Sequence, residues 1–243
     1  MSTTLKIATW NLQRPKAGSW KNTPKILEKI REINADIWVL TETNTVISPG
    51  DDYTSISSTS IPGYHMPGEA CSTIWSRHPA TLIDLPTFDP TIAVCAEIDS
   101  PAGKFIVYGT IITWRDDGVK EGAAQAWERH YRSIANHRED WLKLHQQDLP
   151  FCVAGDFNEA LHEPFAYGTL KGRELLQAAL EETELVCVTA SKKLGYAIDH
   201  ICLSKNWAKA VNDVNGWDKD KCLNDDGKPV TDHNGVYADL RFD

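Results

Sequence analysis

The residues best suited to chemistry are Asp156 and Asn158, two positions apart after the apolar run 149–154. The run predicts a buried strand, and residues i and i+2 at the end of a strand point to the same side. We therefore expect both side chains to face one cleft, with Phe157 packed the opposite way. A carboxylate beside an amide can orient a water molecule against a phosphate. Gly, Asp and Asn are also common turn formers, so an ordinary turn remains the alternative.

Other polar residues fall at the ends of predicted strands. Asn11 ends the first strand, Glu42 follows the second, and Asp232 and His233 precede the last. Ligands of layered sheets collect at strand ends. The oxygens of Asn11, Glu42 and Asp232 suit Mg²⁺ or Mn²⁺ rather than zinc. Any one of these residues alone could equally be a helix cap, a turn residue or a solvated side chain.

Asp199 is harder to explain as a surface residue, because it lies inside the apolar run 197–201. A buried carboxylate needs a partner. Histidine is the suitable type, since a carboxylate orients the imidazole and keeps it basic. We therefore expect Asp199 to pair with a histidine.

The elements that must position these residues follow from hydrophobic spacing and from turn residues. Thr23 as the N-cap, followed by Pro24 at the first helical position, predicts the start of a helix that Asn34 closes. A longer helix is predicted with one apolar stripe, and a third helix around 174–184. Residues 44–70 are expected to form a long loop or an irregular hairpin, and 205–231 to be irregular. The stripe comprises Trp127, Tyr131, Ile134, Trp141 and Leu142. The further strands are predicted at 5–10, 36–40, 72–76, 93–98, 105–112, 185–190, 197–203 and 235–240.

Composition indicates one domain, 1–243, with helices covering paired sheets. The sequence has no apolar stretch near the ~20 residues of a membrane span. The six cysteines are widely separated and the N-terminus lacks an apolar leader core, which favours reduced thiols and an intracellular, cytoplasmic protein. The net charge of −9 argues against a broad nucleic-acid-binding surface. A nuclease remains possible, because bound cations and a local basic patch can reverse the field in a cleft.

Six segments, taken in order, resemble the endonuclease/exonuclease/phosphatase superfamily, which includes deoxyribonuclease I and exonuclease III. Single segments are weak signals, whereas six in the order of the family and over nearly the whole chain are specific. The resemblance implies a four-layered α/β sandwich, with two mixed β-sheets packed face to face and helices outside. It also implies a Mg²⁺-dependent phosphoesterase. The segments are Trp-Asn-Leu at 10–12, Leu-Thr-Glu at 40–42, Ile-Trp-Ser-Arg-His-Pro at 74–79, Gly-Asp-Phe-Asn at 155–158, Ile-Asp-His-Ile at 198–201 and Thr-Asp-His at 231–233.

The resemblance also implies a role for each residue of the site. Glu42 would be the main metal carboxylate, with Asn11 and Asp232 close to the metal or the phosphate. Asp156 would orient or deprotonate the attacking water, and Asn158 would bind a phosphate oxygen. His233, held by Asp199, would contact the phosphate or assist proton transfer.

The chain departs from the family pattern at Ile111, where many relatives carry a histidine. Isoleucine can neither donate a hydrogen bond nor transfer a proton. The sequence therefore does not identify the residue that assists the leaving oxygen. Conceivable substitutes are Tyr108, Thr113, Arg115 and His130.

The leading function is hydrolysis of nucleic-acid phosphodiester bonds, with nucleic acid as the substrate. The alternative is a phosphatase acting on a small ester such as a phosphoinositide or a nucleotide, and the third is a catalytically dead binding module. Arg14, Lys16, Trp20 and Lys21 in the first loop, together with Trp114, are modest candidates for contacts to a nucleic acid. A solvated loop is an equally good explanation of the first four.

Overall fold

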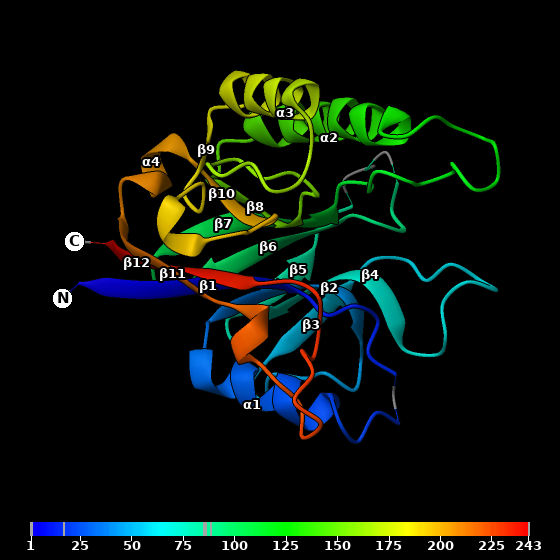
Figure 1. Cartoon of the computed structure of the whole chain (residues 1–243). Coiled ribbons are helices and arrows are strands. Elements are labelled where there is room, and N and C mark those ends of the chain that lie inside the picture. The colour runs from blue at the N-terminus through cyan, green and yellow to red at the C-terminus, as the bar shows by residue number, and fades with distance from the viewer. Residues whose placement is uncertain (1, 17, 85–86, 88, 243) are drawn as a thin grey trace.

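Two mixed six-stranded sheets pack face to face, and helices cover their outer surfaces (Figure 1). This arrangement is seen in a computed structural model that describes residues 2–16, 18–84, 87 and 89–242. Met1 and Asp243, the ends of the predicted domain, lie outside the described residues. The predicted four-layered α/β sandwich is confirmed.

The first sheet has the strand order β11-β12-β1-β2-β4-β3. Strands β1 and β2 run parallel, which a crossover through helix α1 (Thr23–Ile33) makes possible, and the other neighbours are antiparallel. Its strands are β1 (Thr3–Asn11), β2 (Ile37–Asn44), β3 (Thr54–Ser57), β4 (Glu69–Ser76), β11 (Val211–Trp217) and β12 (Gly235–Phe242).

The second sheet has the order β5-β6-β7-β8-β10-β9. Strands β7 and β8 are parallel and are joined through helix α2 (Glu128–His145). Each sheet therefore contains a parallel pair of strands connected through a helix. Its strands are β5 (Ala80–Leu82), β6 (Val94–Ser100), β7 (Gly103–Ile111), β8 (Phe151–Asp156), β9 (Leu185–Cys187) and β10 (Asp199–Ser204).

Three apolar clusters hold the four layers together. The central cluster lies between the sheets, where Val39 of the first sheet and Ala154 of the second are fully buried. A second cluster packs α2 and α3 (Leu170–Glu182) on the second sheet, and a third packs α1 on the first. Burial at about 25 cal/mol per Å² of apolar surface makes these clusters the main stabilising contribution. The remaining helices are α4 (Lys205–Ala208) and the short 3₁₀ turns Lys192–Leu194 and Lys219–Lys221.

Helix α1 is present, and Asn34 ends it in the left-handed conformation, as predicted. The predicted N-cap was wrong by one residue, since Asn22 is the N-cap and Thr23 and Pro24 lie in the first turn. Helix α2 is also present, but the prediction of its buried face was wrong in detail. Ile134 and Trp141 are buried, whereas Trp127, Tyr131 and Leu142 are only partly so. The buried face includes polar side chains because β7 supplies hydrogen-bond partners for His137 and Asp140, and the following Thr113 supplies them for His130 and Ser133. The buried residues are His130, Ser133, Ile134, His137, Asp140, Trp141 and Leu144.

Two further predictions need correction. Strand β2 does not end before Glu42 but continues to Asn44, and Glu42 interrupts its regularity with a φ of 45°. The segment 205–231 is not wholly irregular, since it contains α4 and β11. Strand β11 shows no period-2 pattern because it lies at a sheet edge with little buried surface, and pairing with β12 forms it. Within the described ranges, no helix has the length and apolarity needed to cross a bilayer.

Candidate active site

The sheet topology brings the predicted site residues to one end of the molecule. The parallel strands β1 and β2 end at the same edge, and Thr9 near the end of β1 is paired with Val236 at the start of β12. Asn11 and His233 therefore meet there. In the second sheet, Asp199 at the start of β10 lies directly opposite Asp156 at the end of β8. Antiparallel pairing thus places residues distant in sequence side by side.

Asp156 is fully buried and is held by amide groups. Its Oδ2 accepts hydrogen bonds from Nδ2 of Asn11 at 2.9 Å and from Nδ2 of Asn158 at 3.0 Å, and its Oδ1 accepts from the backbone N–H of Asn158 at 2.8 Å. Asn158 adopts a φ of 48°, a left-handed conformation that asparagine tolerates. As expected, both side chains line one cleft, while Phe157 is buried in the cluster beneath α2 and α3.

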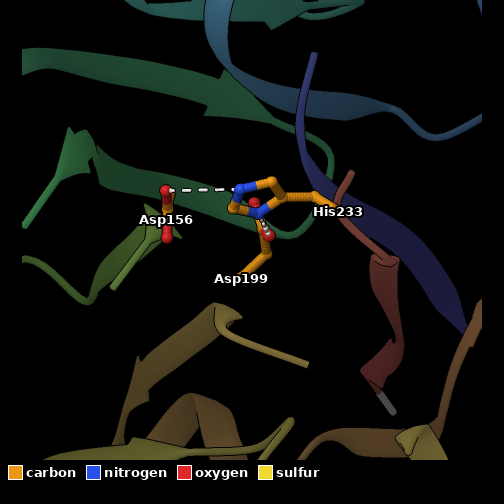
Figure 2. A group of neighbouring side chains, drawn as sticks. All are labelled: Asp156, Asp199 and His233. Atoms are coloured by element: carbon orange, nitrogen blue, oxygen red, sulfur yellow. Dashed lines mark hydrogen bonds and ion pairs between the residues drawn. The ribbon is translucent and has the colours of Figure 1, made fainter. Parts of the chain in front are cut away.

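His233 lies between two carboxylates (Figure 2). Its Nδ1 is 2.7 Å from Oδ2 of Asp199, and its Nε2 is 3.9 Å from Oδ2 of Asp156. The backbone carbonyl of His233 also accepts a hydrogen bond from Nε1 of Trp10 at 3.1 Å. The predicted pairing of Asp199 with His233 is therefore present, and it fixes the ring with Nε2 directed toward Asp156.

The electrostatics of the three residues are coupled. Burial alone lowers the pKa of His233, but the Asp199 and Asp156 carboxylates and the Asp199 hydrogen bond outweigh it and raise the pKa to about 10. Burial raises the pKa of Asp156 to about 7, although His233 and the amide hydrogen bonds oppose it. At neutral pH the imidazole is therefore a cation, and it can donate from Nε2 to an anionic oxygen.

Glu42 and Asn11 form the adjoining part of the site. Nδ2 of Asn11 donates to Oε1 of Glu42 at 3.1 Å, so the same amide joins Glu42 to Asp156. The Oδ1 of Asn11 accepts from the backbone N–H of Gln13 at 2.9 Å. In this arrangement Asn11 orders the two carboxylates, and a metal ion at its oxygen would compete with Gln13.

The donor set fits a hard divalent cation. Glu42, Asp156 and Asp232 all line the cleft with carboxylate oxygens, the ligands that Mg²⁺ and Mn²⁺ prefer. The Oδ1 of Asp199 is buried and has no hydrogen-bond partner among the described residues, so the hydrogen bonding of this carboxylate rests on its Oδ2 contact with His233. Among the described residues, the acidic and histidine atoms that lie within 4.8 Å of one another belong to Asp156, Asp199 and His233, a set different from the predicted ligands.

The site lies in a cleft of about 1180 Å³. Sequence inspection singled out only one of its exposed aromatic residues, Trp114 (47% exposed), and missed Tyr64 (57%) and Tyr196 (66%). Tyr64 is stacked under the guanidinium of Arg14, whose carbon lies 4.3 Å from the ring centroid. These tyrosines come from loops that carry no motif, so only the fold shows that they share a cleft.

A buried ion cluster holds the loop that follows Asn158, and sequence inspection also missed it. The carboxylate of Glu159 is fully buried, 3.2 Å from Nε2 of His130 and 3.1 Å from Nη1 of Arg173. Its Oε1 also accepts from the backbone N–H of Thr169 at 2.9 Å. A buried charge is tolerated only when it is paired. The sequence feature that could have pointed to Glu159 is its position directly after the Gly-Asp-Phe-Asn segment.

The comparison with family profiles identifies the family of the chain. The sequence matches the profile of the endonuclease/exonuclease/phosphatase family over residues 8–233. The chain belongs to this family. An endonuclease/exonuclease/phosphatase enzyme is a metal-dependent phosphoesterase, and the chain is therefore a hydrolase that depends on a divalent metal. Among curated proteins, none matches the sequence.

Solved structures of family members share the fold. An AP endonuclease from Archaeoglobus fulgidus superposes with a TM-score of 0.69 at 17% identity, covering 96% of this chain and 98% of that one. The 3′ phosphatase NExo from Neisseria, bound to a product DNA hairpin, gives 0.68 at 19%, covering 98% and 99%. The human Nocturnin catalytic domain gives 0.64 at 16%, covering 99% and 95%.

Ile111, the position at which the resemblance leads us to expect a histidine, lines the cleft. Of the four suggested substitutes, Thr113 also lines the cleft, and its hydroxyl donates to the carbonyl of Arg129 at 3.2 Å. Tyr108 and His130 are fully buried away from the cleft. Arg115 is exposed and pairs with Asp116.

The first loop contributes less to the cleft than its composition suggested. Arg14 lines the cleft and forms an ion pair with Glu69 at 2.8 Å. Lys21 instead pairs with Asp226 and lies over the ring of Trp20, and neither is among the residues that line the cleft. Lys16 is exposed and likewise does not line it.

Proposed function

We propose that the chain is a Mg²⁺- or Mn²⁺-dependent nuclease that hydrolyses phosphodiester bonds of nucleic acid. The observation that carries this proposal is the meeting of two polar groups at the floor of one cleft. Asp156 and the His233–Asp199 pair form one group, and Glu42 with Asn11 forms the other, linked to it through the Asn11 amide. This is the combination that in-line displacement at phosphorus requires.

Each residue has a role that its contacts support. Asp156 accepts a hydrogen bond from the attacking water and directs it at phosphorus. Cationic His233 donates from Nε2 to a non-bridging phosphate oxygen and offsets its growing charge. Asn158 keeps Asp156 in place, because its side-chain nitrogen already donates to Asp156 and to the carbonyl of Ile112 at 3.0 Å.

Glu42 and Asp232 would hold the divalent ion, with Asn11 beside it. A divalent ion held there would supply Lewis acidity for the phosphoryl oxygen and the leaving oxygen. The carboxylate of Glu42 is oriented for this by Asn11, and the exposed carboxylate of Asp232 lies 3.8 Å from Nε2 of His233.

A second candidate, a phosphatase acting on a small ester, is supported by the charge of the cleft rim. Arg14 is already paired with Glu69, and Lys219 is the only lysine that lines the cleft among the described residues. The acidic residues at the rim would repel a long polyanion. They are Asp89, Asp117, Asp218, Asp220 and Asp232.

A substrate panel tests the proposal. Plasmid DNA, single-stranded DNA, abasic duplex, RNA, phosphoinositides, nucleotides and p-nitrophenyl esters would each be incubated with Mg²⁺, Mn²⁺ or EDTA. We expect cleavage of a polynucleotide with metal, none with EDTA, and no release of phosphate from monoesters.

The matched control is Asp156→Asn, which keeps the shape of the side chain and removes its charge. This variant should fold and bind substrate, with the loss in kcat rather than in KM. Hydrolysis of small esters alone would favour the phosphatase. Binding without turnover of any substrate by the native chain would favour the catalytically dead module and overturn the proposal.

A further inference from the structure

Two cysteines of the second sheet face each other across neighbouring strands, away from the cleft. Cys187 in β9 is the direct partner of Cys202 in β10. Hydrogen-bonded and non-hydrogen-bonded pairs alternate along antiparallel strands. Val188 donates its backbone N–H to the carbonyl of Ile201 at 3.0 Å, which makes 188 and 201 a hydrogen-bonded pair and leaves Cys187 and Cys202 as a non-hydrogen-bonded pair.

This pairing suits a disulfide. In a non-hydrogen-bonded pair the two Cα atoms lie about 4.5 Å apart and the side chains are closest. A disulfide spans Cα separations of about 4.4–6.8 Å, so rotation of the side chains is sufficient. Both cysteines are free, and their side chains pack in the cluster beneath α2 and α3.

We propose that Cys187 and Cys202 form a dithiol that peroxide oxidises to a cross-strand disulfide. The two thiols differ in access. Cys187 is partly exposed on the edge strand β9, whereas Cys202 on β10 is fully buried. Peroxide therefore reaches Cys187 first, and Cys202 lies behind it as the resolving thiol.

The surroundings of Cys187 favour its thiolate. Burial opposes ionisation, but a hydrogen bond from the Cys202 thiol and the neighbouring His200 outweigh it, and the pKa of Cys187 lies well below that of a free cysteine. Nδ1 of His200 lies 3.2 Å from Oγ1 of Thr189, two residues after Cys187. A partly exposed thiolate beside a histidine is the usual setting of an oxidisable cysteine.

The oxidation takes two steps. The Cys187 thiolate attacks one oxygen of hydrogen peroxide, the O–O bond breaks, and hydroxide leaves to give a sulfenic acid, Cys187–SOH. The sulfur of Cys202 then attacks that sulfur, the S–O bond breaks, and the hydroxyl leaves with the Cys202 proton as water. The hydroxide of the first step takes up the proton that Cys187 gave up. Two thiols are oxidised by two electrons, and peroxide is reduced to two waters.

The disulfide would tie the edge strand β9 to β10 and close a loop of residues 188–201. Because a closed loop restricts the unfolded chain, the oxidised protein should melt about 5 °C or more above the reduced one. Neither cysteine lines the cleft. The turnover of the best substrate should therefore change by less than about twofold.

The test is peptide mapping of the full chain after treatment with hydrogen peroxide. Cleavage after Arg173, Lys192, Lys193 and Lys205 separates the two cysteines into peptides 174–192 and 194–205. The expected result is one linked species that is two hydrogens lighter than the two peptides together and that dithiothreitol separates. The melting temperature should rise with peroxide and fall again on reduction.

Cys152 provides the matched control within the same protein. It lies opposite Leu203, so its side chain packs between the sheets and cannot reach Cys202 without unfolding. Cys187→Ser and Cys202→Ser should each abolish the linked peptide and the rise in melting temperature. Linkage of Cys202 to Cys152, or oxidation of Cys187 to sulfinic acid without linkage, would overturn the proposal. The peptide mapping uses the native chain, so it tests the proposal even if a Ser variant fails to fold.

Discussion

At the scale of single residues, one asparagine side chain joins the two parts of the site. Nδ2 of Asn11 contacts both Glu42 and Asp156, which would otherwise repel each other. Glu42 also keeps a φ of 45°, an unfavourable conformation for a non-glycine residue. Strain of this kind persists where the surrounding structure enforces it and is typical of functional sites. The strand irregularity lies at the residue whose carboxylate lines the cleft.

We predict that Glu42→Gln lowers turnover ~10²-fold or more, because it removes the charge of the proposed main metal ligand while keeping its size. The measurement is the rate on the best substrate as a function of Mg²⁺ concentration. Asp220→Asn, an exposed carboxylate at the rim of the same cleft, serves as the control and should change little. Full activity of Glu42→Gln at ordinary Mg²⁺ would remove Glu42 from the metal site.

His233 and Asp199 are predicted to act as one unit, because their 2.7 Å contact both orients the imidazole and keeps it charged. His233→Ala and Asp199→Ala should each lower kcat on the order of 10²-fold. The double variant should lose little more than either single one, because coupled residues are not additive. A double-mutant cycle measures this. Losses that simply multiply would mean that the two residues work independently.

At the scale of the elements, Gly155 allows β8 to end beside β7. Its φ is 140°, and a Cβ there would lie 1.9 Å from the carbonyl oxygen of Thr110 in β7. We predict that Gly155→Ala costs about 3 kcal/mol or more of the free energy of unfolding. Gly103 has a φ of 107° but open space around it. Gly103→Ala is therefore the control that measures the cost of the backbone conformation without a steric contact. Equal losses in denaturant unfolding would show that the contact with Thr110 is unimportant.

The packing of α2 on β7 should make stability depend on pH. His137 is fully buried between Tyr108 and Thr110, at 3.0 and 3.1 Å, and burial lowers its pKa to about 4. The unfolded chain, with a histidine pKa of about 6.5, binds more protons between these values. The contribution of neutral His137 is complete above about pH 6.5 and is lost as the pH falls toward 4.

We therefore predict that His137 accounts for a loss of about 2 kcal/mol of unfolding free energy between about pH 7.5 and pH 5. The measurement is denaturant unfolding at both pH values for the native chain and for His137→Gln, which should show a shallower dependence. His145→Gln, an exposed histidine of the same helix, is the control. An unchanged slope in His137→Gln would contradict the prediction.

At the scale of the whole molecule, the net charge of −9 and the acidic cleft rim separate this enzyme from basic nucleases. Proteins that neutralise several phosphates lose about 10³-fold in affinity or more between about 50 and 200 mM salt. We predict that KM for a polynucleotide changes less than about threefold over this range at constant Mg²⁺, since few cations are available to displace counterions. A steep rise in KM would reveal a basic contact surface outside the cleft.

The prediction of a single domain, 1–243, and that of a cytoplasmic location remain predictions. The layers cover each other through three apolar clusters, and the profile of the endonuclease/exonuclease/phosphatase family spans 8–233. Both observations are compatible with one domain.

The sequence by itself predicted the sandwich, and its six motif segments singled out the seven residues of the candidate site. Apolar runs of strand length, and helix signals such as Thr23-Pro24, report local preferences that tertiary packing here reinforces. Asp199 was recognisable because a carboxylate among isoleucines requires a partner. Helix α2 shows the limit of such reasoning. Its buried face contains His137 and Asp140, which apolar spacing cannot identify because their hydrogen-bond partners lie on β7.

Only the tertiary structure decided which distant residues touch. The 2.7 Å contact of His233 with Asp199 and the Asn11 bridge from Glu42 to Asp156 depend on strand register, which is set by pairing between segments far apart in the chain. The same holds for the aromatic cleft rim, for the Glu159 cluster and for the cross-strand cysteines. Strand β11 formed although its sequence lacks alternation, because the free edge of β12 supplied its hydrogen bonds. Local preference acts over a few residues, whereas a site is made by contacts across the whole chain.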